Sequence, residues 1–562
     1  MFKIQVISSL VLVIIVGYSL QETKTTYKAG VVEYYPSSDK NFDNKVQNNL
    51  DAYKEFINNA TKKEVDILVF PEGTLNGGIK DREEANNNAV EFKFPNNEIL
   101  CPPSRAKPPS IMETLSCEAK ANKIYVVVNL SEKERCTAQS QQAAQDDRPC
   151  ATDGNNYYNT DVVFDRNGAI VARYRKYNLF SEKHFNTTKA PEHSTFVTDF
   201  NVTFGLFTCF DIMFNEPTLA MVREGVKDFI FPTMWFSELP FLTALQVQEY
   251  WSHSNDVNLL AAGASNTALG SGGSGIYAGR MGPLITYMSI PQNENKENEN
   301  NKLLIADVPI LKYTTPQKND TKPNGEKTER NALFNADISS RDAISGDAVK
   351  MDKFILIKDD IKEYASKLIG KELGNQFSEE ICNNELCCTF NVTSIISNKT
   401  ESGFSYYQYR AIVGDVVRSF SGVTNGGIKA CGIVACSGDT IETCGSRFND
   451  SSKVGKRHIF TNIHIEGKFP NIDDVFTMPN TLSHSMKPLD NSRFIYHEEK
   501  KEGEDQKSIT MDLRGLPADE LQTFGIYGRD FRYDGSGSSM LPNAFALSLL
   551  IMGYLWTYLV GN

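Results

Sequence analysis

The chain of 562 residues is longer than one hydrophobic core usually organises, so its length predicts two domains plus processed ends. Hydrophobic residues make up 40% of the chain, which is enough for packed cores. The formal net charge of -12 and the sequence pI near 5.3 argue against nucleic acid as a partner, because its binding depends on clustered Lys and Arg. A small-molecule substrate is therefore expected.

The N-terminus has the layout of a secretory signal peptide. Lys3 is followed by an apolar run over residues 4–16 and by the small residues Gly17 and Ser19. An uncleaved membrane anchor is the alternative, and the shortness of the apolar run argues against it. We expect residues 1–21 to be removed.

Short apolar strands alternate with helical patterns along the first half of the chain. One helical face is formed by Phe42, Val46, Leu50, Tyr53 and Ile57, and further helices are predicted within 217–225 and 239–254. Strands are predicted at 27–34, 65–70, 124–130, 203–207, 228–231, 258–263 and 303–310. Near-continuously apolar strands that alternate with helices indicate a largely buried α/β sheet.

A β-hairpin is predicted between Asp161 and Lys176, in DVVFDRNGAIVARYRK. The pair Asn167-Gly168 is typical of a tight turn between two strands. The second strand of the hairpin leads directly into Lys176.

The glycine-rich stretch at 268–279 lacks the Lys-Ser/Thr ending of a phosphate cradle. It is interpreted as a mobile loop that leads into a strand. The polar, low-complexity run at 292–302 predicts a solvent-exposed loop.

A domain boundary is predicted at residues 313–331, which lack apolar periodicity and contain Pro316, Pro323 and Gly325. Residues 22–312 then form the first domain. Residues 332–533 hold six cysteines and alternating segments such as FSYYQYRAIV, which predict a second, β-rich, disulfide-stapled domain.

The C-terminal residues 534–562 match the order of a glycosylphosphatidylinositol (GPI) attachment signal. Small residues at 535–537 precede a short polar spacer and an apolar tail over 544–560. A transmembrane helix is the alternative, but the tail is short for a span and no Lys or Arg follows it. We expect lipid attachment at Gly535 or Ser536, which would hold the protein on the outer leaflet of the membrane.

The eleven cysteines fall into two even groups with one residue between them. In an oxidising compartment, even groups predict disulfides within each group. The odd residue, Cys209, is then either a reactive thiol or an intermolecular partner. The paired groups are Cys101, Cys117, Cys136 and Cys150, and Cys382, Cys387, Cys388, Cys431, Cys436 and Cys444. The late group contains no paired C-x-x-C units, so no metal site is expected.

Eight Asn-x-Ser/Thr triplets are compatible with a glycosylating pathway. They start at Asn59, Asn129, Asn186, Asn201, Asn319, Asn391, Asn398 and Asn449.

Three segments each place one reactive side chain directly after an apolar strand, where loops build the sites of α/β folds. They are LVFPEGTL with Glu72, ARYRKYNLF with Lys176, and FGLFTCFDI with Cys209. Cysteine attack on a carbonyl needs a thiolate, which a lysine favours while a carboxylate accepts or returns the proton. The backbone N–H of Phe210 could hold a developing oxyanion together with Lys176.

With these three segments in this order, the sequence resembles the nitrilase superfamily. The phrases NTDVVFDRNGAIVARYRKYNLFSEKHFN, FGLFTCFDIMFNEP, FPTMW and GSGIYAG resemble its vanin and biotinidase branch. The resemblance implies a four-layer αββα sandwich and assigns Glu72 as base, Lys176 as electrostatic stabiliser and Cys209 as nucleophile, with no cofactor.

The resemblance leaves other site residues open. Many nitrilase relatives carry a further Glu before the Lys, but nothing in the sequence chooses between Glu132 and Glu134, and neither is assigned. The residues next to the motifs are candidates to line a pocket, with loop or core packing as the alternative: Asn129, Glu182, His184 and Trp235.

The resemblance implies hydrolysis of a secondary amide. Pantetheine, giving pantothenate and cysteamine, is the first candidate, and biotinyl amides are the second. A non-catalytic cell-surface binding protein on the same scaffold is the alternative from another class.

Overall fold

The computed structural model describes residues 24–94, 99–102, 110–290, 301–311, 351–370, 376–397, 401–501, 503–515 and 517–535. The predicted signal peptide, the linker at 313–331 and the C-terminal signal beyond Gly535 lie outside these ranges. Among the helices that are described, none is long and apolar enough to cross a bilayer.

Two six-stranded sheets form the first part of the structure. The first sheet has the order β13 (Lys302–Pro309), β1 (Thr26–Glu33), β2 (Ile67–Val69), β3 (Tyr125–Arg135), β4 (Asn155–Phe164) and β5 (Ile170–Arg175). The second has the order β12 (Pro283–Tyr287), β11 (Ser274–Ala278), β10 (Asn258–Gly263), β8 (Asp228–Thr233), β7 (Thr203–Leu206) and β6 (Thr195–Val197). The central strands of each sheet run parallel, as the alternation of strands and helices predicted.

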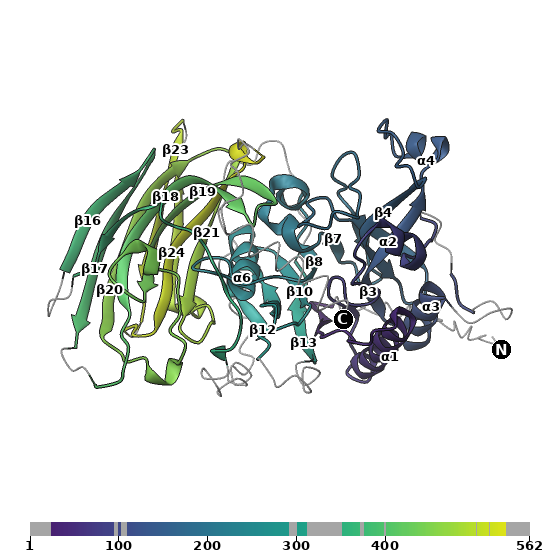
Figure 1. The fold of residues 1–562 in the computed structure, drawn as a ribbon, viewed down its shortest axis with the longest axis horizontal. Helices are drawn as coiled ribbons and strands as arrows, with labels where there is room; N and C mark the ends of the chain where they lie inside the picture. The colour runs from purple at the N-terminus through teal and green to yellow at the C-terminus, as the bar shows by residue number, and fades with distance from the viewer. Residues whose placement is uncertain are drawn as a thin grey trace, which may run out of the picture.

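The two sheets pack face to face between helices, which gives the predicted four-layer αββα sandwich (Figure 1). Val31 points into the core between the sheets, and its neighbour Val32 points to the outer core under α1 (Phe42–Thr61) and α3 (Ile111–Asn122). Successive residues of a strand face opposite sides, so both faces of these strands are apolar. On the far side, α6 (Ala244–Asn255) packs Trp251 against Phe207 and Phe229 of the second sheet.

The helix predicted from residues 42–57 is α1. Its N-cap, Asn41, accepts a hydrogen bond from the N–H of Asn44 at 3.0 Å, and Leu50, Tyr53 and Ile57 are buried. The remaining helices of this domain are short: α2 (Arg82–Asn88), α4 (Ala138–Ala143) and α5 (Ala220–Arg223).

The predicted hairpin is formed by β4 and β5, which pair antiparallel. Gly168 has a φ of +81°, and the Asp165 carboxylate caps the turn by accepting from the N–H groups of Asn167 and Ala169, both at 2.8 Å. Lys176 follows β5 directly, as predicted.

The glycine-rich stretch differs from its prediction. It leads into β11 as expected, but its residues are mostly buried and close-packed rather than a free loop. A Cβ at Gly273 would lie 2.6 Å from the Cβ of Ala244, so glycine is needed here for close approach.

The second part of the structure consists of two five-stranded antiparallel sheets. One has the order β15 (Ala365–Leu368), β18 (Gln408–Phe420), β19 (Thr424–Cys436), β24 (Leu521–Asp530) and β21 (Val475–Ser483). The other has the order β16 (Gln376–Asn383), β17 (Leu386–Ile396), β20 (His458–Pro470), β23 (Gln506–Leu513) and β22 (Phe494–Lys500).

The disulfide prediction is confirmed, since the cysteines pair within their own groups and Cys209 is free. The pairs are Cys101–Cys117, Cys136–Cys150, Cys382–Cys387, Cys388–Cys431 and Cys436–Cys444. The bridge Cys388–Cys431 joins the two sheets of the second domain.

The two parts share an extensive interface, in which α6 lies between the second sheet of the sandwich and β21 (Figure 1). Gln246 of α6 donates to the side chain of Asn480 at 2.7 Å, and Asn480 donates to the carbonyl of Phe241 at 2.9 Å. The short strands β9 (Glu238–Leu239) and β14 (Ile357–Lys358) also pair across this interface.

Candidate active site

Cys209 occupies a sharp turn between β7 and the 3-10 helix Cys209–Met213. Its φ of +47° lies in the left-handed region, which costs a non-glycine residue on the order of 1 kcal/mol and is common where function needs a side chain in one place. The thiol is buried, with the residue 7% exposed.

Asp211 holds this turn in shape. Its carboxylate accepts hydrogen bonds from the N–H of Thr208 at 3.1 Å, from the Tyr174 hydroxyl at 2.7 Å and from the N–H of Asn178 at 2.8 Å. Burial raises the pKa of Asp211 to about 6, although these donors oppose the shift. The carboxylate therefore ties the cysteine turn to the loop after Lys176.

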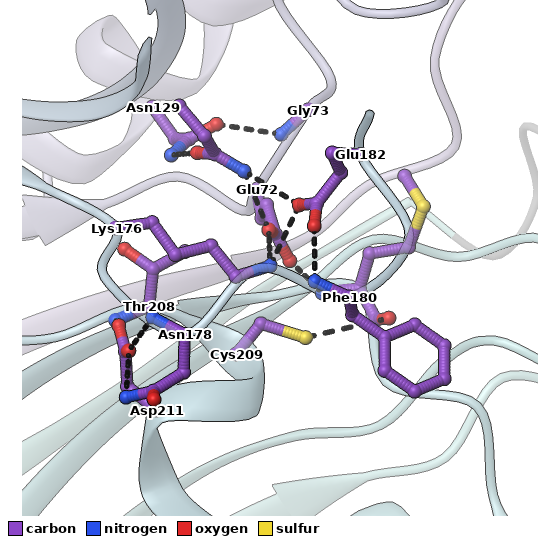
Figure 2. Close-up of polar contacts among 12 residues, drawn as sticks. Glu72, Gly73, Asn129, Lys176, Asn178, Phe180, Glu182, Thr208, Cys209 and Asp211 are labelled. Carbon is purple, nitrogen blue, oxygen red and sulfur yellow. Dashed lines mark hydrogen bonds and ion pairs between the residues drawn. The ribbon is translucent and has the colours of Figure 1, made fainter. Parts of the chain in front are cut away.

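Lys176 lies between two carboxylates. Its Nζ is 2.8 Å from Oε1 of Glu72 and 2.7 Å from Oε1 of Glu182, and the lysine side chain is 1% exposed (Figure 2). Burial alone would lower the pKa of Lys176, but the charges of Glu182 and Glu72 outweigh it and raise this pKa well above its ordinary value. Lys176 is thus a fixed, desolvated cation.

Glu72 is fixed by two further hydrogen bonds, one of them from a side chain that Asn129 holds in place. Its Oε2 accepts from the N–H of Met234 at 2.9 Å, and its Oε1 accepts from Asn159 Nδ2 at 2.8 Å. Asn129 Nδ2 in turn donates to Asn159 Oδ1 at 2.7 Å, and its Oδ1 accepts from the N–H of Gly73 at 2.8 Å (Figure 2). The carboxylate therefore has one defined orientation.

Asp161 links this network to the cysteine turn. It accepts from Asn129 Nδ2 at 2.8 Å and from the hydroxyl of Thr208, the residue before Cys209, at 2.7 Å. Burial raises the pKa of Asp161 to about 8, against the effect of both donors.

The thiol of Cys209 is protonated in this resting arrangement. Burial and then the charge of Glu72 raise its pKa well above the ordinary value, and Lys176 only partly opposes them. The sulfur lies 3.6 Å from the carbonyl oxygen of Met234. A nucleophile in this state needs a base to take its proton when a substrate arrives.

A pocket of about 470 Å³, part of it open to solvent, lies in front of the sulfur. Its walls are mostly aromatic and aliphatic, which is typical of small-molecule sites. They are formed by Phe180, Cys209, Phe210, Met213, Met234, Trp235, Phe236, Glu238, Leu242, Ile357, Phe420 and Ser421.

The structure brings Glu72, Lys176 and Cys209 together from three loops, as the sequence predicted (Figure 2). Of the candidate pocket residues, Trp235 lines the pocket, with its Nε1 donating to the carbonyl of Leu242 at 2.9 Å. Phe210 lines it too.

The other three candidate pocket residues lie elsewhere. Asn129 and Glu182 belong to the polar cluster around Glu72 and Lys176 rather than to the pocket walls. His184 packs against Phe185, with ring centroids 4.1 Å apart, and is not among the residues that line the pocket. Loop packing, the alternative weighed for His184, accounts for its position.

The second carboxylate beside Lys176 is Glu182, which follows the lysine in sequence, and not a glutamate before it. Glu132 and Glu134 instead pair with Arg175, at 2.5 and 2.9 Å, on the opposite side of β5 from Tyr174. Glu182 also accepts a hydrogen bond from the N–H of Phe180.

The glycosylation prediction at Asn129 is wrong. The residue is 2% exposed, and both polar atoms of its amide are used inside the cluster. Asn201 and Asn449 are exposed, and Asn59, Asn186 and Asn391 are partly exposed. Asn319 and Asn398 lie outside the described residues.

Sequence reasoning missed Asn159, Asp161 and Asp211. A signal existed for the first two, because residues two apart on a strand share a face, and two polar residues on the same face of the apolar run YYNTDVVF are unusual. Asp211 lies two residues after Cys209 and carried no separate signal.

Two segments of the chain match known protein families. Residues 28–248 match the carbon-nitrogen hydrolase family, and residues 354–534 match the vanin C-terminal domain. The first match contains the whole polar cluster, and the second contains the pocket residues from the second domain.

Curated relatives match over most of their length. Vanin-like protein 1 of Drosophila melanogaster is 36% identical over 519 residues, which cover 89% of this chain and 85% of the relative. Pantetheinase of Bos taurus is 31% identical, with 75% of this chain and 76% of the relative covered. Biotinidase of Homo sapiens is 28% identical, with 75% of each chain covered.

Proposed function

Because the chain belongs to the vanin and biotinidase branch of the carbon-nitrogen hydrolase (nitrilase) superfamily, we propose that it hydrolyses a secondary amide through a thioester on Cys209. The observation that carries this proposal is the position of a buried thiol beside a fixed Glu72 carboxylate and a permanently charged Lys176, at the end of a pocket. A thiol nucleophile, a base for its proton and a cation for the developing oxyanion are together sufficient for amide hydrolysis through a covalent intermediate.

In the first half of the reaction, Glu72 takes the thiol proton as the sulfur attacks the amide carbonyl carbon. Lys176 and the N–H of Phe210 stabilise the negative charge that develops on the carbonyl oxygen. The carbon–nitrogen bond then breaks, and the leaving amine receives the proton from Glu72. The product of this half is a thioester on Cys209.

In the second half, a water molecule replaces the amine. Glu72 takes one of its protons while the oxygen attacks the thioester carbonyl, and the carbon–sulfur bond breaks as the thiol regains a proton. Glu182 stabilises the charged form of Lys176 and fixes its position in both halves of the reaction, because the lysine lies between the carboxylates of Glu72 and Glu182.

Pantetheine is the first candidate substrate and a biotinyl amide is the second. Both are candidates because a relative named pantetheinase and a relative named biotinidase match the chain at similar identity. The largely apolar pocket can receive an uncharged acyl or amine group. The test is to follow amine release from matched pantothenyl and biotinyl amides with purified protein. Faster release from biotinyl amides would reverse the order of the candidates. No release from any amide would favour a binding protein.

We also propose that residues 22–312 and 332–533 are the two domains, consistent with the extents of the family matches.

A GPI-anchored position on the outer face of the cell membrane is part of the same proposal. Five disulfides favour an oxidising compartment. Phosphatidylinositol-specific phospholipase C should release the amidase activity from expressing cells into the medium. Activity that stays on the cells, with the last residues of the chain still detectable by antibody, would contradict the anchor.

A further inference from the structure

One wall of the pocket in front of Cys209 belongs to the second domain. Phe420 and Ser421, at the turn between β18 and β19, and Ile357 of β14 line the pocket together with residues of the catalytic sandwich. Ser421 has a φ of +52°, which is a left-handed conformation that shapes this turn. The cavity is therefore incomplete without the second domain.

An ion-pair cluster anchors this wall to the catalytic domain. Arg418 binds both oxygens of Glu238, at 2.5 and 2.9 Å, and its Nη1 lies 2.8 Å from Asp359. All three side chains are at most 11% exposed. The guanidinium also lies 4.7 Å from the ring of Phe420, so it supports the turn from behind.

The wall also contacts the turn that carries Cys209. The rings of Phe420 and Phe210 are 5.7 Å apart in an edge-to-face arrangement. Arg529 donates to the carbonyl of Met213 and lies 4.8 Å from the Phe420 ring. The position of Phe420 relative to the sulfur is thus fixed from two sides.

The charge on this wall is unfavourable for anions. Glu238 lines the pocket, and the single arginine beside it is shared between two carboxylates. No uncompensated positive charge from this cluster faces the pocket, and the other lining residues are apolar apart from Cys209 and Ser421. A carboxylate placed here would lose its hydration without gaining a partner.

We propose that the turn at residues 418–421 of the second domain is a specificity-determining wall, at which Phe420 packs against the substrate and Glu238 rejects anionic groups. The enzyme then selects amides whose substituent at this wall is uncharged. The turnover part of this inference rests on the proposed function, whereas the shape and charge of the wall do not.

Alkylation of Cys209 tests the wall without any substrate. The rates for iodoacetamide, N-benzyl iodoacetamide and N-(4-carboxybenzyl) iodoacetamide are measured by peptide mass spectrometry. The unaltered protein should prefer the benzyl reagent to its carboxylated analogue. Phe420→Ala should lower the benzyl-to-iodoacetamide rate ratio about tenfold, because one apolar contact is lost. Glu238→Gln should raise the rate of the carboxylated reagent relative to the benzyl reagent by a similar factor.

Val417→Ala is the matched control, since this side chain lies on the same strand but is 43% exposed and does not line the pocket. It should leave both rate ratios unchanged. If Phe420→Ala does not fold, Phe420→Leu decides the same point with a smaller expected change. Ratios that stay at the unaltered value in folded Phe420 and Glu238 variants would overturn the proposal.

The second arm compares kcat and KM for a pair of pantothenyl amides that differ only in a carboxylate on the amine. The neutral amide should be preferred, and Glu238→Gln should narrow the preference mainly through KM. If the unaltered protein cleaves neither amide, the proposed function fails, but the alkylation ratios still decide whether the wall selects by shape and charge.

Discussion

At the scale of single residues, the site is built around the ammonium group of Lys176, which is held in one position. Lys176 is buried between Glu72 and Glu182, so its charge is available to an oxyanion without solvent reorganisation. The sequence predicted Glu72, Lys176 and Cys209 because each directly follows an apolar strand. It did not predict the position of Glu182, because the contact depends on how the loop after Lys176 folds back.

The role of Glu182 can be tested by charge removal at constant shape. We expect Glu182→Gln to lower kcat at least tenfold with little change in KM, because Lys176 loses one of its two carboxylates while the pocket walls stay intact. Steady-state kinetics on a cleaved amide provide the measurement.

Glu134→Gln is the control, because Glu134 pairs with Arg175 outside the cluster. Equal losses of kcat in both variants would mean that Glu182 acts only through general stability.

At the scale of elements, local pattern predicted the central strands of the sandwich and the helices α1 and α6, but not α2, α3 or α4. The strands β1, β8 and β10 follow their apolar runs to within two residues, β3 continues five residues beyond its run, and the turn at Gly168 follows from its sequence. The pairing order within the two five-stranded sheets of the second domain could not be predicted, because antiparallel neighbours there are set by long-range packing. The buried glycine-rich stretch was misjudged for the same reason, since its close neighbour Ala244 lies on another element.

The disulfides of the second domain differ in the length of the loop that each one closes. Cys388 and Cys431 are 43 residues apart and join two sheets, whereas Cys382 and Cys387 are 5 apart within one hairpin. Loop-closure entropy predicts that replacing the first pair by Ala lowers the free energy of unfolding by about 4 kcal/mol, and replacing the second by about 2 kcal/mol. Denaturant unfolding of the two double variants measures both losses. A larger loss for the short loop would contradict this prediction.

At the scale of the whole molecule, both parts of the structure build the pocket in front of Cys209, because the sandwich supplies most of its walls and the second part supplies Ile357, Phe420 and Ser421. The sequence predicted both domains and their cysteine groups. Their contact through α6, Arg418 and Phe420 could not be predicted, since no local pattern marks an interface between residues so far apart in the chain.

Three buried histidines should each contribute a loss of stability in mild acid, which buried carboxylates with a raised pKa, such as Asp161 and Asp211, oppose. Burial lowers the pKa of three histidines to about 4: His253, His458 and His484. The unfolded chain takes up their protons first as the pH falls through about 6.5, so this stability is present above pH 6.5 and is lost between pH 6.5 and 4. Each residue contributes a slope of at most about 1.4 kcal/mol per pH unit.

His458 is the sharpest test of this acid sensitivity, because neither ring nitrogen has a hydrogen-bond partner among the described residues. As the pH falls from 6.5 to 4, the unfolding free energy of His458→Leu should increase relative to that of the unaltered protein, because the contribution of His458 is removed. His497→Leu, at an exposed position of the same domain, should not. An unchanged slope in His458→Leu would show that His458 does not carry the effect.

The central claim is that Cys209 carries the acyl group between the two halves of the reaction. Acid quenching of the unaltered enzyme during turnover, followed by peptide mass spectrometry, should trap the proposed acyl adduct before water hydrolyses it. The account predicts an adduct on the Cys209 peptide alone, released by neutral hydroxylamine as a thioester is, and absent from Cys209→Ala. Sustained amide turnover by Cys209→Ala, or an acyl group on another residue, would contradict it.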